Sequence, residues 1–185
     1  MVTGSEIYAR AAGKDRAAFE TLMTATKGGL FRFVRRYTGD DEDALDLVQE
    51  TYTAAWLAIH RYDPARPFDV WLRAIALNKC RDWGRRRTVR RWIRQTVGLD
   101  APEATHVADR TPDTDALIDD RRRIERLNTA LRDLPDNLKA PLLLTSIDGR
   151  SQQEAAQILG ITAKAVETRI ARARQKLASA MMCEG

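Results

Sequence analysis

Apolar residues recur along most of this chain at the three- and four-residue steps of a helix. From Ser5 to about Tyr37 this spacing is interrupted once, near residues 12–15, which predicts two helices. The same periodicity predicts helices over about 42–59, 70–87, 117–134 and 137–147, and Pro135 ends the third of these. We therefore predict an all-α protein.

Two segments in the first half carry more specific predictions. Residues 60–69, HRYDPARPFD, contain two prolines and predict a loop, after which Asp69 is placed to cap the next helix. In the helix over 42–59, one apolar stripe is expected to face the core. The stripe consists of Leu45, Val48, Tyr52, Ala55 and Ile59.

The composition changes from about Val97 to Asp115, where Gly, Pro, Asp, Thr and Ala dominate and no apolar period remains. Such a segment is typical of a linker with local acidity. We place two small helical domains at residues 1–94 and 117–185, joined by a flexible linker over 95–116. At 185 residues, the chain is long enough for two domains of this size.

The stretch from Asp148 to Leu177 predicts a helix-turn-helix. Ser151 and Glu154 have the spacing of a reciprocal capping box, and Gly160 stands where a left-handed residue would end the first helix. Thr162 is placed to cap the second helix. The apolar wedge between the two helices would consist of Leu159, Ile161, Val166 and Ile170. An ordinary helical hairpin is the alternative.

The second helix of this motif has a face suited to DNA. Its members are Lys164, Thr168, Arg169, Arg172 and Lys176, with Glu167 as the only acid among them. A helix fits the width of the major groove, where such side chains can contact base edges and phosphates. A solvated charged face is the alternative interpretation.

The positive charge of the chain is concentrated, which favours a polyanionic partner. The formal net charge is +5, the pI is about 9.5, and six arginines fall between residues 85 and 94. Asn78, Arg81 and Arg85 share one face of the helix over 70–87. Aromatic residues stand near this face in the sequence, at Tyr62, Phe68, Trp71 and Trp83. Aromatics beside cations suit single-stranded nucleic acid, although core packing is the alternative, above all for Phe68 and Trp71.

A separate polar face on the helix over 42–59 holds Asp46, Gln49, Glu50 and Thr53. Spacing alone favours plain solvent exposure. A metal site built from Asp43, Asp46 and Glu50 is a further alternative, but no histidine or second acidic cluster completes it. With two cysteines, two histidines, and neither a CxxC motif, a signal peptide nor an apolar span, we expect no metal or cofactor, no membrane insertion and a cytoplasmic location.

These motifs, in their order and spacing, resemble a bacterial sigma factor of the extracytoplasmic-function group, which contains only sigma-70 regions 2 and 4. In the first half the resemblance rests on DLVQE (46–50), on TYTAAW (51–56), and on Phe68, Trp71, Leu72, Ile75 and Ala76 with Asn78, Asp82, Arg85 and Arg86. In the second half it rests on Leu131, Leu134, Pro135, the stretch 148–161, Val166, Arg172 and Arg174.

The resemblance implies a subunit that binds core RNA polymerase, directs it to promoters and is held inactive by an anti-sigma protein. It implies a surface for core polymerase at Asp46, Gln49, Glu50 and Thr53. It implies contacts with the unpaired minus-10 strand at Tyr62, Phe68, Asn78, Arg81, Arg85 and Arg86, and with the minus-35 duplex at Lys164, Glu167, Thr168, Arg169 and Arg172. Glu167 departs from the basic residue common in the family. The other hypotheses are a stand-alone helix-turn-helix regulator and a metal-dependent nucleic-acid enzyme.

Overall fold

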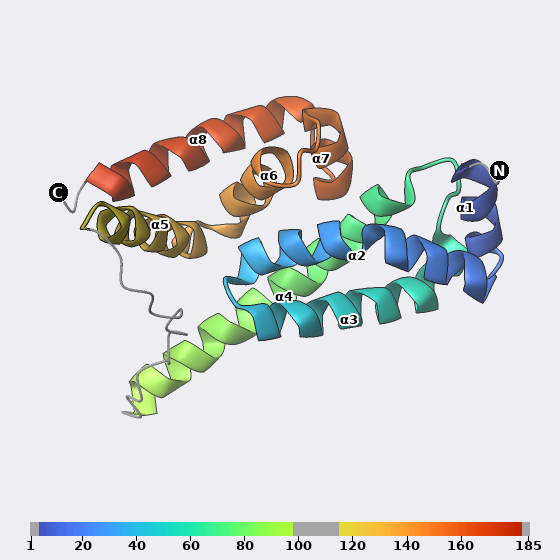
Figure 1. Cartoon of the computed structure of the whole chain (residues 1–185), viewed down its shortest axis with the longest axis horizontal. Helices are drawn as coiled ribbons and strands as arrows, with labels where there is room; N and C mark the ends of the chain where they lie inside the picture. Colours follow the sequence, from blue (N-terminus) through green and yellow to red (C-terminus); the bar gives the residue numbers. More distant parts are fainter. Residues whose placement is uncertain (1–3, 98–114, 183–185) are drawn as a thin grey trace.

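A computed structural model describes residues 4–97 and 115–182, and over these ranges the protein is all-α, as predicted. The first unit contains α1 (Gly4–Ala12), α2 (Arg16–Thr38), α3 (Asp41–Ala58), the 3₁₀ turn η1 (Ile59–Arg61) and α4 (Phe68–Val97). The second contains α5 (Asp115–Asp133), α6 (Asp136–Ser146), α7 (Gln152–Leu159) and α8 (Ala163–Met182). Figure 1 shows α6 and α7 packed along one side of the α1–α4 bundle.

Local side-chain chemistry fixes the turns of the first unit. Asp15 caps α2 by accepting a hydrogen bond from the backbone N–H of Ala18. Gly39 ends α2 with a left-handed φ of 78°, and Asp40 caps α3 by accepting from the N–H groups of Glu42 and Asp43. The predicted break near residues 12–15 is therefore confirmed.

The core of the first unit lies between α2, α3 and α4, where Phe33, Phe68 and Leu72 are almost fully buried. The predicted stripe on α3 was wrong at one position, because Leu45 is 48% exposed. The helix is rotated so that its buried face runs through Ala44, Leu47, Val48, Thr51, Tyr52 and Ala55. The apolar band on α3 is wider than one residue per turn. Packing against α2 and α4 therefore decides which of two neighbouring residues is buried.

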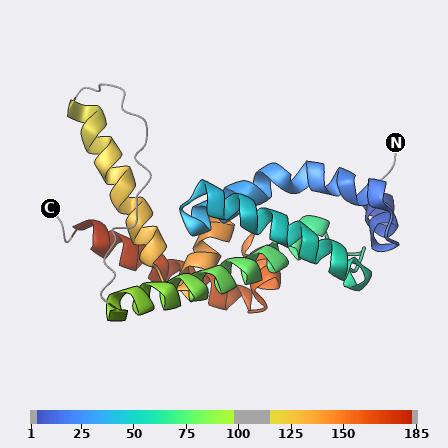
Figure 2. The same ribbon diagram turned by 90° about the horizontal axis from the view of Figure 1, so that it is seen from below.

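In the second unit, α6 is the central element and packs against α7, α8 and α2. Leu143, Leu144 and Val166 are completely buried there. Helix α5 points away from the rest of the molecule (Figure 2), and its Ile124 and Leu127 remain 58% and 39% exposed. The apolar spacing of α5 thus predicted a helix correctly, but part of its apolar face is uncovered.

Two predicted boundaries were wrong. Helix α4 begins at Phe68, so Asp69 lies inside its first turn rather than at the cap, and the helix continues ten residues beyond Arg87 to Val97. No glycine or proline occurs between Gly84 and Gly98 in the sequence, and arginine is a good helix former. The ends of the predicted linker, 95–97 and 115–116, are therefore helical, while 98–114 lies outside the described residues.

The two units contact each other through α4 with α7 and through α2 with α6. None of the helices in the ranges 4–97 and 115–182 is long and apolar enough to cross a membrane.

Candidate nucleic-acid interface

The helix-turn-helix forms as predicted, and its capping box is complete. The backbone N–H of Ser151 donates to Glu154 Oε2 at 2.9 Å, and the N–H of Glu154 donates to Ser151 Oγ at 3.1 Å. Gly160 ends α7 with φ 65°, and Thr162 Oγ1 accepts from the N–H of Ala165 at 3.1 Å to cap α8. These contacts fix the direction in which α8 leaves the turn.

We predict that Ser151→Ala lowers the free energy of unfolding by about 1 kcal/mol at pH 7. The hydrogen bonds from Ser151, backbone first, hold the pKa of Glu154 below its ordinary value. That contribution is complete above the unfolded pKa and disappears as pH falls through the lower folded pKa. Urea unfolding followed by circular dichroism should therefore show the difference between wild type and variant shrinking below about pH 4.5. A difference that grows toward acid would contradict it.

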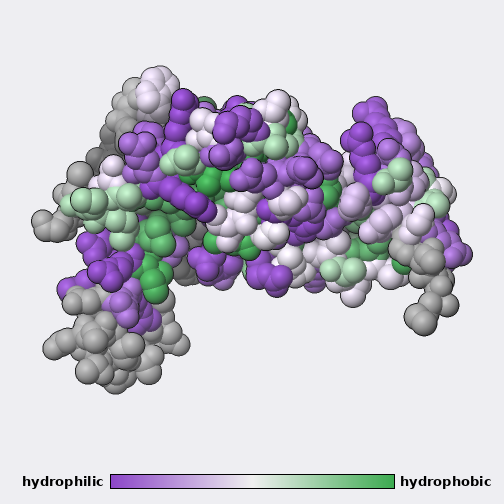
Figure 3. All heavy atoms as spheres, turned by 90° about the horizontal axis from the view of Figure 1, so that it is seen from above, coloured by the Kyte–Doolittle hydropathy of each residue, from purple (hydrophilic) through white to green (hydrophobic). Residues whose placement is uncertain are grey.

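Helix α8 presents its polar face to solvent and its apolar face to the core. Lys164, Glu167, Thr168 and Arg172 are exposed and Arg169 is half-buried, so all five predicted minus-35 residues lie on one helix. Val166 and Ile170 are buried on the opposite side. The side of the molecule that carries α7 and α8 is largely hydrophilic, with smaller apolar areas (Figure 3).

One ion pair lies within this polar face. Lys164 Nζ donates to Glu167 Oε2 at 2.8 Å, while Thr168 Oγ1 donates to the backbone carbonyl of Lys164. Both charged side chains are largely exposed, so the pair contributes little to stability and its members are free to exchange partners.

The candidate minus-10 residues on α4 divide into accessible and occupied groups. Asn78, Arg85 and Arg86 are exposed, and Arg85 forms an ion pair with Asp82. Arg81 Nε instead donates to Asp136 Oδ2 in the second unit at 2.7 Å. Asn78, Arg85 and Arg86 are therefore accessible at the surface, whereas Arg81 is bound to Asp136.

Tyr62 and Phe68, the two aromatic residues of the predicted minus-10 set, are buried in the free protein. They are only 4% and 1% exposed, and their centroids lie 5.5 Å apart in an edge-to-face contact. Tyr62 also stacks against Trp71, and its hydroxyl donates to the carbonyl of Arg66 at 2.5 Å. Burial raises the pKa of Tyr62, which keeps this donor protonated. The rings hold the path of the proline-containing loop because they exclude water from its base.

The polar face of α3 is exposed at Asp46, Gln49, Glu50 and Thr53. Glu50 forms an ion pair with Lys79 of α4 at 3.1 Å. Asp43, the third member of the alternative metal site, accepts a hydrogen bond from Trp83 Nε1 at 2.9 Å. Among the described residues, no group of three metal-binding side chains lies together.

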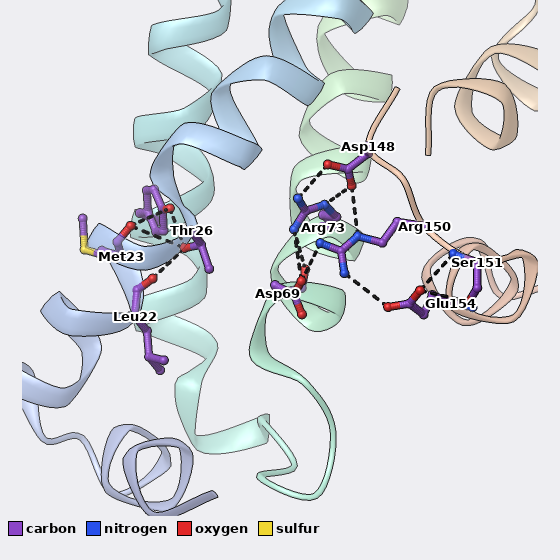
Figure 4. Close-up of polar contacts among 10 residues, drawn as sticks. Leu22, Met23, Thr26, Asp69, Arg73, Asp148, Arg150, Ser151 and Glu154 are labelled. Atoms are coloured by element: carbon purple, nitrogen blue, oxygen red, sulfur yellow. Dashed lines mark hydrogen bonds and ion pairs between the residues drawn. The ribbon is translucent and has the colours of Figure 1, made fainter. Parts of the chain in front are cut away.

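A buried group of charges lies between the two units and was not predicted from the sequence; it is shown in Figure 4 and called here the Arg73 cluster. Arg73 on α4 binds Asp148, which precedes α7, through two hydrogen bonds; the one from Nη2 measures 2.7 Å. Arg150 forms ion pairs with Asp69, Asp148 and Glu154 at 2.5, 3.2 and 3.2 Å. The sequence does carry a signal for this cluster, because Arg73 stands beside Leu72, Ala76 and Leu77 on the buried face of α4. A buried charge requires a partner.

A second group, the Asp136 cluster, joins the units about α2 and α6. Its members are Tyr37, Arg81, Asp136 and Lys139. The Tyr37 hydroxyl and Arg81 Nε both donate to the Asp136 carboxylate, and Lys139 Nζ lies 5.2 Å from the centre of the Tyr37 ring. Burial and the Asp136 carboxylate raise the pKa of Tyr37, and burial lowers the pKa of Lys139.

Comparisons with known proteins agree with the geometry. The family described as Sigma-70 region 2 matches residues 22–96, and Sigma-70, region 4 matches residues 124–177. RNA polymerase sigma factor CnrH of Cupriavidus metallidurans is 38% identical over 174 residues, covering 94% of this chain and 91% of CnrH. The ECF RNA polymerase sigma factor SigE of Mycolicibacterium smegmatis is 30% identical over 178 residues, covering 95% of this chain and 66% of SigE.

Solved structures give the same result. CnrH in complex with the cytosolic domain of CnrY has a TM-score of 0.70 and 31% identity, covering 98% of this chain and 99% of that one. The sigma factor RpoE of Bartonella quintana, solved with the anti-sigma factor NepR, has a TM-score of 0.65 at 20% identity and covers 90% of this chain and 98% of its own, which supports the fold alone.

Proposed function

The chain belongs to the extracytoplasmic-function group of the sigma-70 family, and from this membership we propose that it binds core RNA polymerase in the cytoplasm and directs it to its own promoters. The observation that carries the proposal is the order of the two matched regions, with an exposed polar helix in the first and an exposed helix-turn-helix face in the second. The protein performs no catalytic step, because RNA synthesis belongs to the core enzyme.

In this proposal region 2 covers residues 1–94, the linker covers residues 95–116, and region 4 covers residues 117–185. Three surfaces bind core polymerase, the minus-10 strand and the minus-35 duplex. Core polymerase binds α3 at Asp46, Gln49, Glu50 and Thr53. The unpaired minus-10 strand binds Asn78, Arg81, Arg85 and Arg86 on α4, where an amide and three cations suit bases and phosphates. The minus-35 duplex binds α8 at Lys164, Glu167, Thr168, Arg169 and Arg172, and Glu167 is suited to accept a hydrogen bond from a cytosine amino group.

An anti-sigma protein controls the availability of these surfaces. The supporting observation is that CnrH, which is similar to this chain, was solved in complex with the cytosolic domain of CnrY. The similarity to CnrH extends over 98% of this chain in the structure comparison. A protein that covers α3 or α4 would prevent binding to core polymerase or to the minus-10 strand.

The direct test is in vitro transcription on a fragmented genomic library, with core polymerase from the same bacterium and with or without this protein. Discrete new start sites that require the protein are expected, and their upstream sequences would define both promoter elements. An absence of transcripts, together with specific duplex binding by the protein alone, would instead identify a stand-alone helix-turn-helix regulator.

We predict that Arg172→Ala reduces transcription from such a promoter by removing a groove contact worth about 1–3 kcal/mol. Arg36→Ala is the control, because Arg36 is also an exposed arginine but lies on α2, outside the three assigned surfaces. Transcription should be measured on promoters with matched and mismatched minus-35 sequences. Equal wild-type activity on both promoters would overturn the assigned role of this face.

A further inference from the structure

The last turns of α4 carry an exposed apolar stripe that the proposed function does not use. Val89, Trp92 and Ile93 are 55%, 66% and 48% exposed. They stand three and four residues apart, so they are neighbours on one face of the helix. Ala76 and Cys80, by contrast, are completely buried on the opposite side of α4. The stripe therefore faces away from the helix bundle.

The stripe lies on a part of α4 that extends beyond the bundle. Figure 1 shows the end of α4 continuing past the start of α3. A helix rises about 1.5 Å per residue, so the segment from Gly84 to Val97 is roughly 20 Å long. Because the stripe is on its outer side, this segment can lie along a flat surface without obstruction by α2 or α3.

Positive charge flanks the stripe. Residues 83–97 contain six arginines and no acidic residue. Arg86 and Arg90 are exposed, and the guanidinium of Arg87 lies 5.2 Å from the centre of the Trp83 ring. The end of α4 is therefore an amphipathic helix, with a tryptophan in its apolar face and arginines beside it.

A partner for this surface must supply both an apolar environment and negative charge, because exposed apolar area of this kind marks an interaction site. A DNA backbone supplies phosphates but little apolar contact for Val89 or Ile93. An anionic membrane supplies both, since tryptophan and aliphatic side chains enter the headgroup boundary while arginines bind lipid phosphates. A flat bilayer also suits a projecting helix, whereas a protein partner would need a groove shaped to receive it.

We propose that the end of α4 binds the surface of membranes that contain anionic phospholipid. Val89, Trp92 and Ile93 enter the headgroup boundary, and Arg86 and Arg90 bind the phosphates. The chain lies on the bilayer through this one helix end.

The lipid site and the minus-10 site exclude each other. Val89 stands four residues beyond Arg85 and eleven beyond Asn78, so the stripe continues the same face of α4. A chain on the bilayer presents this face to lipid and not to the unpaired strand. This consequence rests on the proposed function, while the lipid site itself does not.

The test is flotation of the full chain with vesicles of phosphatidylcholine alone or of an equimolar mixture with phosphatidylglycerol. We expect binding to the mixed vesicles only, weakened as the salt concentration rises. Trp92→Ala with Ile93→Ala should lower the partition coefficient about 10- to 100-fold, because two large apolar side chains are lost. Arg90→Gln should lower it roughly fivefold, the contribution of one arginine near an anionic surface.

Ile124→Ala with Leu127→Ala is the matched control, because these apolar side chains are 58% and 39% exposed on α5. Arginines are present on α5 too, but the acidic residues Asp120 and Glu125 accompany them. This variant should bind the mixed vesicles as wild type does. The helical circular dichroism signal should be unchanged in both double variants, since none of the four side chains is buried.

Three results would overturn the lipid site: equal binding to both kinds of vesicle, no binding to the mixed vesicles, or wild-type binding by the Trp92 and Ile93 double variant. If that variant lost promoter or core binding and kept its vesicle binding, the stripe would belong to DNA or to core polymerase instead. Mixed vesicles should lower transcription by wild type and core more than transcription by the variant and core; equal inhibition would contradict the shared face. An absence of transcripts from wild type and core would defeat the proposed function and leave flotation unaffected.

Discussion

Phe68→Ala should lower the free energy of unfolding by about 3–5 kcal/mol, a large part of the stability of an ordinary domain. The ring is 1% exposed and contacts the rings of Phe19, Tyr62 and Trp71 at centroid distances of 5.9, 5.5 and 5.7 Å. Its removal leaves a cavity at the start of α4 that the packed helices around it fill only in part. Urea unfolding followed by Trp fluorescence would measure the loss, since Trp71 adjoins the site.

Asn78→Ala is the control that separates stability from DNA contact. Asn78 is exposed on the same helix, so its loss should change stability by less than about 0.5 kcal/mol while weakening opening of the minus-10 element. If Phe68→Ala kept wild-type stability but lost open-complex formation, the ring would act on the DNA itself, as the family resemblance implies.

Gln49→Ala combined with Glu50→Ala should raise the Kd for core polymerase roughly 30- to 1,000-fold, or about 2–4 kcal/mol. Both side chains are exposed on α3 and adjoin each other in the surface assigned to core polymerase. A polar pair at the centre of an interface contributes this much when its partners become unpaired on truncation. Fluorescence anisotropy of the labelled chain titrated with core enzyme would measure the change, with circular dichroism to establish that α3 remains folded.

Lys79→Ala is the matched control for the lost ion pair. It removes the 3.1 Å contact between Lys79 and Glu50 but leaves Glu50 available to a partner. Because this pair is exposed, its loss should change stability by no more than about 1 kcal/mol and should leave core affinity near that of wild type. A double variant that binds core as tightly as wild type would remove α3 from the proposed interface.

Local features of this protein were predictable because short stretches of sequence encode them. The capping box of Ser151 and Glu154 and the left-handed Gly160 depend on residues within one or two turns, so the helix-turn-helix followed from spacing alone. Exposure of the candidate DNA face on α8 followed in the same way from a helix with one buried and one polar side. The order of the motifs gave the family, which the comparisons show.

Features that depend on which of two neighbouring positions a helix buries were less predictable. Leu45 was expected in the core and is exposed, because packing against α2 and α4 buries the neighbouring Ala44 and Leu47 in its place. Tyr62 and Phe68 carry the composition of a nucleic-acid surface, yet they close the base of the proline-containing loop against Trp71. Aromatic residues near cations give the same sequence pattern whether their rings lie in the core or on a nucleic-acid surface.

The sequence by itself determined the helices, the helix-turn-helix with its caps, and the family, since each rests on contacts between residues near in the chain or on motifs in order. Only the tertiary structure decided that Arg73 meets Asp148 and that Arg81 meets Asp136, 75 and 55 residues away. A charged side chain in a helical stripe shows that a partner is needed, but long-range packing alone selects which carboxylate supplies it. For that reason the packing of the two regions against each other could not be predicted from the sequence.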